Sequence, residues 1–243
     1  MRKAVALFLA VLLAAHVALA GDPWKEKPYT AWTLEDVQKI LGESPWAKVV
    51  TVEAAWLKGE PHFLQGMAPG CGGRPDLNKP MRTPSQWVVG TPSQSIVAFQ
   101  VTWDSAKTMR AAKLRLAVLC GTMDQEDTAD ILEREDDSYT VTISAPDMTP
   151  FDGISEEDLL ANTYLMLKTT KQRLAPSNVV IAHGFDRKTV FRLTFEFPKK
   201  TDSGAPTILP DEKEIELVST AGKTVLKTKF QPPKMLAKTA IDF

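Results

Sequence analysis

The sequence predicts an α+β fold, with helices packed on one face of a mainly antiparallel sheet. Segments in which every second residue is apolar, the pattern of half-buried strands, fill most of the C-terminal third. Helical segments stand between strands in the first two thirds, and each long segment has a single apolar stripe. One stripe per element suits a two-layer arrangement around a common core.

The first 20 residues have the order of a cleavable secretory signal peptide. Arg2 and Lys3 precede an apolar stretch, and Ala18-Leu19-Ala20 supplies small residues at the two positions that signal peptidase reads. The stretch is short for a membrane span, which takes about 20 residues. We therefore expect cleavage before Gly21 and an exported protein, periplasmic or extracellular. The mature chain, residues 21–243, is expected to form a single domain without a transmembrane segment.

The first helix of the mature chain is predicted from Thr33 to Gly42. Thr33 can cap the free amides, acidic residues follow in the first turn, and Gly42 is a plausible stop. A turn then leads to a strand over residues 48–53. The apolar face of the helix consists of Leu34, Val37, Ile40 and Leu41.

Residues 59–95 differ from the rest of the chain, because they contain 6 of the 13 glycines and 6 of the 17 prolines. We expect a long loop or an ordered insertion here, and segments of this length are often functional. Of the six tryptophans, Trp87 in this stretch is the best candidate for a ligand-facing ring. Trp103, in contrast, is expected in the core because it belongs to an alternating strand.

The middle of the chain has a strand, a helix and a second strand. Residues 97–103 alternate as a half-buried strand, and Asp104 or Ser105 is placed to cap a helix over residues 106–119. The next strand lies around residues 139–143.

One further helix is predicted after residue 155, where Ser155-Glu156-Glu157-Asp158 has the form of a capping box. Basic residues follow at its expected C-terminal end, as the helix dipole favours. Its expected apolar face consists of Leu159, Leu160, Thr163, Tyr164 and Leu167, and the basic residues are Lys168, Lys171 and Arg173.

The C-terminal third is predicted to be strands. One covers residues 179–181, and another covers residues 190–197. Residues 213–220 and 223–231 flank Ala221-Gly222, which predicts a hairpin. In the second strand the expected apolar side consists of Phe191, Leu193, Phe195 and Phe197, and in the hairpin it consists of Ile215, Leu217, Leu226 and Phe230.

Charge excludes one class of function. The chain has 29 basic and 30 acidic residues, so it lacks the basic footprint of general nucleic-acid binding. Eight acidic residues gather at 124–137, which suggests Ca²⁺ binding as one interpretation. The run lacks the residue order of the common calcium loop, so a solvated helix or loop is favoured.

The chain has two cysteines, Cys71 and Cys120. In an exported protein the two can form a disulfide. In the alternative, Cys120 is a buried small hydrophobe at the end of an apolar segment and Cys71 is a free thiol. Their spacing fits no metal-binding or thioredoxin-like motif, and the sequence leaves both alternatives open.

No catalytic, cofactor-binding or metal-binding residue is predicted. His62 and His183 lack the spacing of a zinc-binding pair, and His183 is expected in a turn between strands. Gly222-Lys223-Thr224 is similar to the end of a phosphate-binding loop, but Leu217 stands where that loop needs glycine. The hairpin is therefore the favoured interpretation of this segment.

Four segments carry a family resemblance: Tyr29–Thr33, Leu41–Ala47, Phe99–Ala106 and Phe195–Lys199. They resemble a family of uncharacterised exported proteins of soil bacteria. The resemblance covers residues 27–56 and 95–236 and leaves out the 59–95 stretch. It implies no activity and no catalytic residue.

Two functional hypotheses follow. The first is an exported, non-catalytic binding or scaffold protein of the cell envelope, with an unknown envelope or extracellular partner. It rests on the missing catalytic motif, the scarcity of histidine and the strand-rich pattern. The alternative is a carboxylate-based hydrolase with residues 59–95 over its cleft. Two or three buried, unpaired carboxylates that converge in a pocket would favour the enzyme.

Overall fold

The computed structural model describes residues 21–58, 63–64, 70–71, 94–184, 186–237 and 240–243. The predicted signal peptide lies outside these residues. So does most of the 59–95 stretch, including His62 and Trp87.

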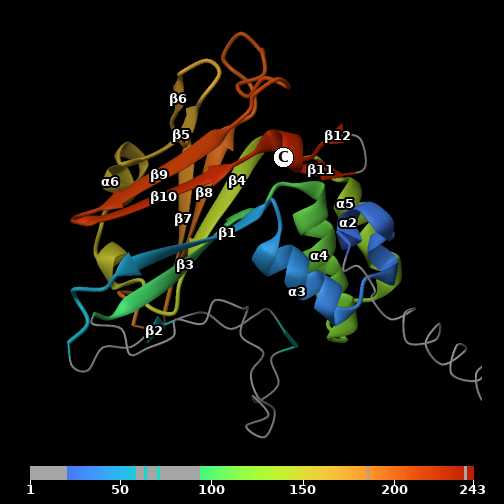
Figure 1. Ribbon diagram of the computed structural model, residues 1–243, viewed down its shortest axis with the longest axis horizontal. Coiled ribbons are helices and arrows are strands. Elements are labelled where there is room, and N and C mark those ends of the chain that lie inside the picture. Colours follow the sequence, from blue (N-terminus) through green and yellow to red (C-terminus); the bar gives the residue numbers. More distant parts are fainter. Residues whose placement is uncertain (1–20, 59–62, 65–69, 72–93, 185, 238–239) are drawn as a thin grey trace, which may run out of the picture.

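Two mainly antiparallel sheets form the body of the molecule (Figure 1). The larger is ordered β1-β3-β4-β8-β7, with the two-residue β2 beside β3, and the smaller is ordered β10-β9-β5-β6. This confirms the predicted α+β class and its mainly antiparallel pairing. The strands are β1 (Ala47–Glu53), β2 (Phe63–Leu64), β3 (Ile96–Trp103), β4 (Ser138–Ser144), β5 (Thr163–Leu167), β6 (Arg173–Leu174), β7 (Asn178–His183), β8 (Val190–Pro198), β9 (Ile215–Ala221), β10 (Thr224–Phe230), β11 (Leu236–Ala237) and β12 (Ala240–Ile241).

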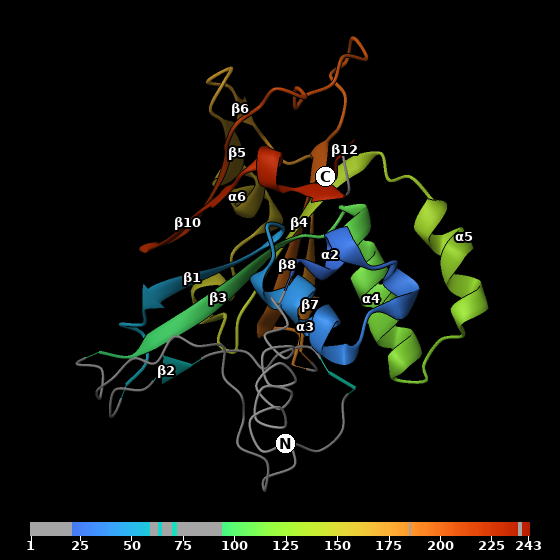
Figure 2. The same cartoon turned by 45° about the vertical axis from the view of Figure 1, so that its right-hand side comes forward.

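Helices α2 to α5 lie together on one side of the sheets, whereas α6 lies apart from them (Figures 1 and 2). Within the group, α3 packs against both α4 and β1. The helices are α2 (Pro23–Glu26), α3 (Leu34–Glu43), α4 (Lys107–Leu119), α5 (Thr128–Glu133) and α6 (Glu156–Ala161). Among the described residues, none of these helices combines the length and apolar character needed to cross a bilayer.

One core cluster joins the two sheets and the helices α2 to α6. Trp103 on β3 is fully buried, as its alternating strand predicts, and its ring lies 5.2 Å from that of Phe230 on β10. Tyr139 and Phe243 pack on the same indole at 5.8 and 5.7 Å. Edge-on and tilted aromatic contacts of this kind add to the stabilisation from buried area.

Helix α3 begins as predicted. The Thr33 hydroxyl accepts the Asp36 N–H, and the Asp36 carboxylate accepts the Thr33 N–H, which completes a capping box. Val37, Ile40 and Leu41 are buried, but Leu34 is 39% exposed. The apolar stripe therefore begins one turn later than the sequence predicts.

Helix α4 forms over the predicted residues, but its predicted cap is wrong. Asp242 accepts the N–H groups of Lys107 and Thr108 at 2.5 and 2.8 Å. Ser105 instead accepts the Thr140 N–H, and Asp104 bonds Thr142 on the sheet. The cap therefore comes from a residue more than 130 positions away, which a local pattern does not reveal.

The helix predicted after Ser155 is too long. The Ser155 hydroxyl accepts the Asp158 N–H, so the helix starts as predicted, but α6 ends at Ala161. Residues 163–167, with the basic residues beyond them, are not helical: β5 begins at Thr163 and pairs with β9. Every second residue of β5 is buried, namely Thr163, Leu165 and Leu167. Strand pairing with β9 therefore decides the structure of this segment, although the spacing of its apolar residues also fits a helix.

Strand β8 departs from the predicted alternation at its start. Ala182 on β7 lies opposite Arg192, but His183 lies opposite Val190, so Phe191 is an extra residue in a bulge. As a result Val190 is buried and Phe191 is 55% exposed. The Phe191 ring lies against Gly184, where a Cβ atom would be 2.9 Å from it.

Two further predictions are decided by the structure. The β9–β10 hairpin forms as expected, with Gly222 at a φ of +58° and the four predicted apolar residues buried. Cys71 and Cys120 form a disulfide with their Cα atoms 4.9 Å apart. The alternative of a buried thiol at Cys120 is wrong.

Candidate binding surfaces

Strand β7 is an open edge of the larger sheet, because it pairs only with β8. Helix α6 lies near it, but among the described residues no backbone hydrogen bond joins β7 to any element other than β8. An edge strand presents a row of unpaired N–H and C=O groups that can bind another strand. The β7 edge is therefore a ready site for strand addition.

The composition of β7 sets it apart from the other edges. Natural edge strands are usually protected by charged side chains or by being very short. In the larger sheet β1 contains Lys48 and Glu53, and in the smaller sheet β10 contains Lys227 and Lys229. Of the described edge strands longer than two residues, β7 alone has no Lys, Arg, Asp or Glu.

Exposed apolar side chains accompany this edge. Val180 in the middle of β7 is 52% exposed, and Phe191 on the neighbouring strand is 55% exposed. Val180 shares a sheet face with Ala182, and the Phe191 ring lies against Gly184, two residues further along. The outer face next to the edge therefore offers apolar contact area.

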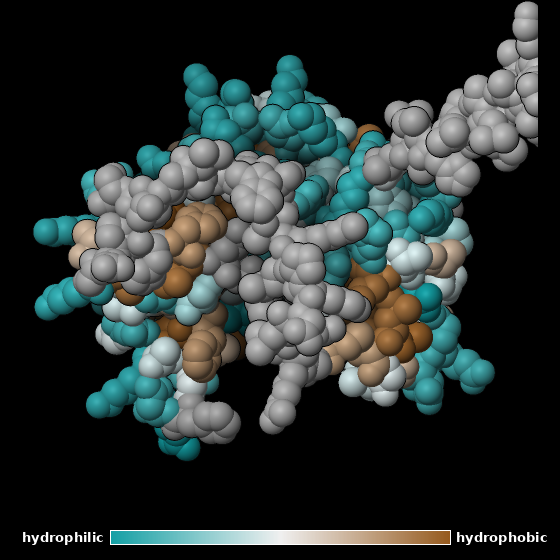
Figure 3. All heavy atoms as spheres, turned by 60° about the horizontal axis from the view of Figure 1, so that its bottom comes forward, coloured by the Kyte–Doolittle hydropathy of each residue, from teal (hydrophilic) through white to brown (hydrophobic). Residues whose placement is uncertain are grey.

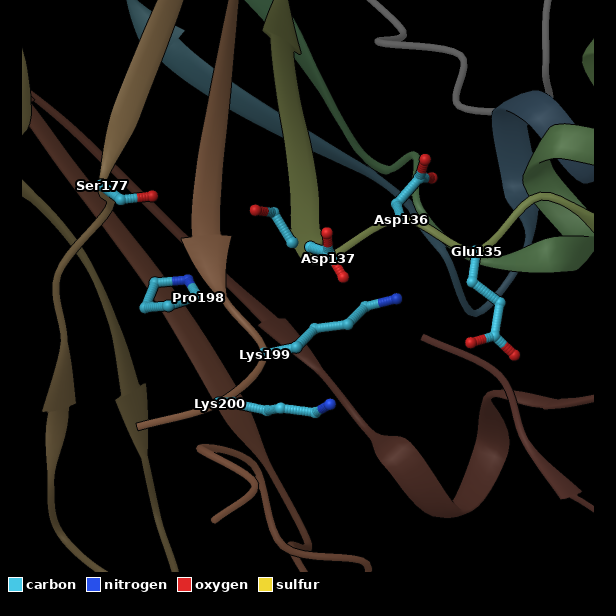
Figure 4. Close-up of a pocket in the computed structure, with 8 residues that line it drawn as sticks. Glu135, Asp136, Asp137, Ser177, Pro198, Lys199 and Lys200 are labelled. Carbon is cyan, nitrogen blue, oxygen red and sulfur yellow. The ribbon is translucent and has the colours of Figure 1, made fainter. Parts of the chain in front are cut away.

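A first pocket, of about 370 Å³, lies at the end of the sheet where β7 begins. Figure 4 shows Lys199 and Lys200 extending side by side, with Asp136 and Asp137 on the neighbouring segment. No ion pair joins these lysines to these carboxylates in the described part of the chain; Asp136 lies 3.8 Å from Arg110 instead. Polar groups of either charge can approach this pocket from solvent.

A second pocket, of about 640 Å³, lies at the opposite end of β7. Its lining includes the half-buried side chains of Ile154 and Ile181. Glu156, Arg187 and Lys188 also line it, and neither cation has an ion-pair partner among the described residues. The β7 edge thus runs from one charged pocket to the other.

The β7–β8 turn beside the second pocket is fixed by Asp186. Its carboxylate accepts the Thr189 hydroxyl at 2.6 Å and the N–H groups of Lys188 and Thr189 at 3.0 and 2.9 Å. These bonds, the Thr189 hydroxyl first, lower the pKa of Asp186 to about 2. The turn therefore holds an ionised carboxylate at any physiological pH, with Arg187 in the left-handed region at a φ of 56°.

The β10 edge, unlike the uncharged β7 edge, carries charged side chains that form ion pairs. Lys229 lies 2.9 Å from Glu214, which also accepts a bond from Lys168 at 3.5 Å. The bond to Glu214 raises the pKa of Lys229, and the bond to Lys229 lowers the pKa of Glu214. Because these groups are exposed, the pairs contribute little to stability, but they keep charge on that edge.

The carboxylates that line the two pockets are exposed, and not of the buried, unpaired kind expected of a hydrolase. Glu212 and Asp242 are the two buried carboxylates of the described residues. Asp242 caps α4, and Glu212 accepts bonds from Thr169 and from the N–H groups of Lys213 and Glu214. The other Glu212 oxygen, Oε2, is buried with no hydrogen-bond partner among the described residues. Neither Glu212 nor Asp242 lines either of these two pockets, so this unpaired oxygen lies outside both.

The acidic run at 124–137 is divided among several local structures. Its first half forms a turn of 3₁₀-helix and α5, and Glu135, Asp136 and Asp137 line the first pocket. No group of three or more His, Cys, Asp or Glu side chains in the described part of the chain is arranged to hold a metal ion.

Apolar residues are also exposed on the helical side of the molecule. Leu34 at the start of α3 and Leu119 at the end of α4 are 39% and 37% exposed. Figure 3 shows hydrophobic residues gathered where these helices lie. Leu119 is next to Cys120, so this patch adjoins the disulfide.

Some parts of these surfaces can be predicted from the sequence and others cannot. His183 is the last residue of β7 and lies beside the turn in which it was expected, and it lines the second pocket. The β7 strand was predicted, but its position at an edge was not. The uncharged run Val179-Val180-Ile181-Ala182 is the one local signal that distinguishes it.

Comparisons with family models, curated proteins and solved structures gave no match to this chain.

Proposed function

We propose that this protein is an exported, non-catalytic binding or scaffold protein of the cell envelope that holds a protein partner along β7. The observation that carries the proposal is the uncharged, unpaired edge of β7, in a molecule whose other long edges are charged. Strand addition supplies affinity through main-chain hydrogen bonds and specificity through alternate side chains. Val180, Phe191 and the pockets at the two ends of β7 provide side-chain contacts for such a partner.

Export is part of the same proposal. The order of residues 1–20, the resemblance to exported proteins and the Cys71–Cys120 disulfide support it, because disulfides persist in oxidising compartments. Mass spectrometry of the protein recovered from the envelope of its native host should find Gly21 at the N-terminus. Recovery of a mature form that retains residues 1–20 would contradict export by cleavage.

The binding surface is tested by placing a charge on the edge. Val180→Lys is expected to reduce the recovery of partners at least about fivefold, because an ammonium group opposes strand pairing at an uncharged edge. Residue 180 is half exposed, so the fold should tolerate the lysine. The measurement is quantitative mass spectrometry of proteins that co-purify from an envelope extract.

Val225→Lys is the matched control. It makes the same substitution at a 45% exposed valine on β10, an edge that already has two lysines. Wild-type recovery is expected for this variant. Equal recovery with Val180→Lys and Val225→Lys would show that β7 is not the binding surface.

The hydrolase alternative is not retained as a second candidate. Its proposed lid lies mostly outside the described residues, and the buried carboxylates Glu212 and Asp242 bind main-chain and threonine donors away from both pockets. The unpaired Glu212 Oε2 is a feature that a hydrolase would use, but it does not line either pocket.

A further inference from the structure

We propose that the strand added to β7 is β7 of a second copy of this chain, paired antiparallel across a two-fold axis beside Val180. This inference rests on the proposed function, in which β7 is the binding edge, and it names the occupant. The resulting dimer would join the two larger sheets, edge to edge, into one continuous sheet.

The register follows from the length of the regular ladder. Residues 178–182 pair with β8 without interruption, and the bulge begins after Ala182. Residues directly opposite each other in an antiparallel pair lie on the same sheet face. A two-fold axis between two residues would place each residue opposite its own chain neighbour, which points to the other face. The axis must therefore pass beside a single residue. Val180 is the centre of the five regular residues, and pairing there uses all five.

The side chains that meet in this register are compatible. Val180 would lie opposite Val180 of the second copy on the outer face, where each is now 52% exposed. On the same outer face Asn178 would lie opposite Ala182, and on the inner face Val179 would lie opposite Ile181. Every pair is uncharged, and β-branched pairs are favourable across antiparallel strands.

The chemistry of the edge points to a self-complementary partner. A strand that is uncharged, free of proline and contains β-branched residues suits this edge, and β7 itself has these properties. A two-fold interface brings the same patch together from both subunits. The polar pockets flank the paired strands at each end, because antiparallel pairing sets the beginning of one β7 beside the end of the other.

The size of the interface predicts a weak dimer. A five-residue edge buries less area than the roughly 1,200–2,000 Å² typical of stable complexes. The association is therefore expected to be reversible and concentration-dependent, and the disulfide-bonded mature chain is the species to study.

Substitutions of opposite charge at residue 180 test this pairing, because residue 180 of one copy would lie opposite residue 180 of the other. Sedimentation velocity of the wild-type mature chain from about 10 μM to about 1 mM should show a reversible dimer. Val180→Lys and Val180→Glu should each weaken the dimer by roughly five- to tenfold or more, since like charges would lie directly opposite. An equal mixture of the two variants should restore a dimer containing one of each, and Val225→Lys should dimerise as the wild type does.

Persistence of the dimer in Val180→Lys, or failure of the mixture to associate, would overturn the pairing. A wild-type chain that stays monomeric at about 1 mM would also overturn it. In that case the co-purification comparison separates the two proposals. Selective loss of envelope partners in Val180→Lys would keep the proposed function with a different occupant, and no loss would remove both.

Discussion

Removing the disulfide is expected to lower the free energy of unfolding by about 4 kcal/mol. The bond joins Cys71 to Cys120 across a sequence separation of 49 residues, and closing a loop of that length restricts the unfolded chain by about this amount in the entropy model. Cys71 is exposed and Cys120 is half-buried, so serine at both positions removes little packing. The predicted loss therefore comes mainly from the unfolded state.

The measurement is urea unfolding of the oxidised wild type and the Cys71→Ser/Cys120→Ser variant. Reduction of the wild type should reproduce the loss, and the same reductant should leave the double variant unchanged. A difference below about 1 kcal/mol would mean that the unfolded chain gains little freedom when the bond is absent.

Asp242→Ala is expected to destabilise the protein by about 3 kcal/mol. The carboxylate accepts two N–H groups at the start of α4, and it is 7% exposed. Loss of a helix cap costs up to about 2 kcal/mol, and a buried donor left without an acceptor costs about 1–3 kcal/mol. The Asp242 carbonyl also accepts the Trp46 indole N–H at 2.6 Å, and this main-chain contact fixes the segment that carries the cap.

Asp242→Asn is the matched control, because it keeps the size and one acceptor oxygen. It should lose roughly half as much stability as Asp242→Ala. Amide exchange should report faster opening at Lys107 and Thr108 in the alanine variant. If both variants unfold like the wild type, the cap is not a significant contributor to the stability of α4.

The parts of the fold that depend on local pattern were predictable. The capping box at Thr33 and the glycine turn at Gly222 place their hydrogen bonds within a few residues, so the sequence displays them directly. Residues 163–167 show the limit of this reasoning. Their apolar residues fit a helix and a strand equally well, and the decision comes from pairing with β9, more than 45 positions away.

The candidate site was less predictable than the fold. Composition and alternation identify β7 as a strand, but its exposure at an edge depends on the order of the whole sheet. The bulge that exposes Phe191 depends on where β7 and β8 lose register. The α4 cap at Asp242 is likewise a long-range contact. These features arise from tertiary pairing, and no local motif encodes them.

Photo-crosslinking from residue 180 in the exporting host tests the central claim, that β7 is the binding edge, most directly. A photoreactive amino acid at position 180 should give a covalent adduct through β7. Pairing with a second copy predicts that this adduct has the mass of two chains and that its peptide map joins β7 to β7. The same amino acid at position 225, on the lysine-protected β10 edge, should give little adduct. Equal crosslinking from the two positions, or none from position 180, would contradict the account.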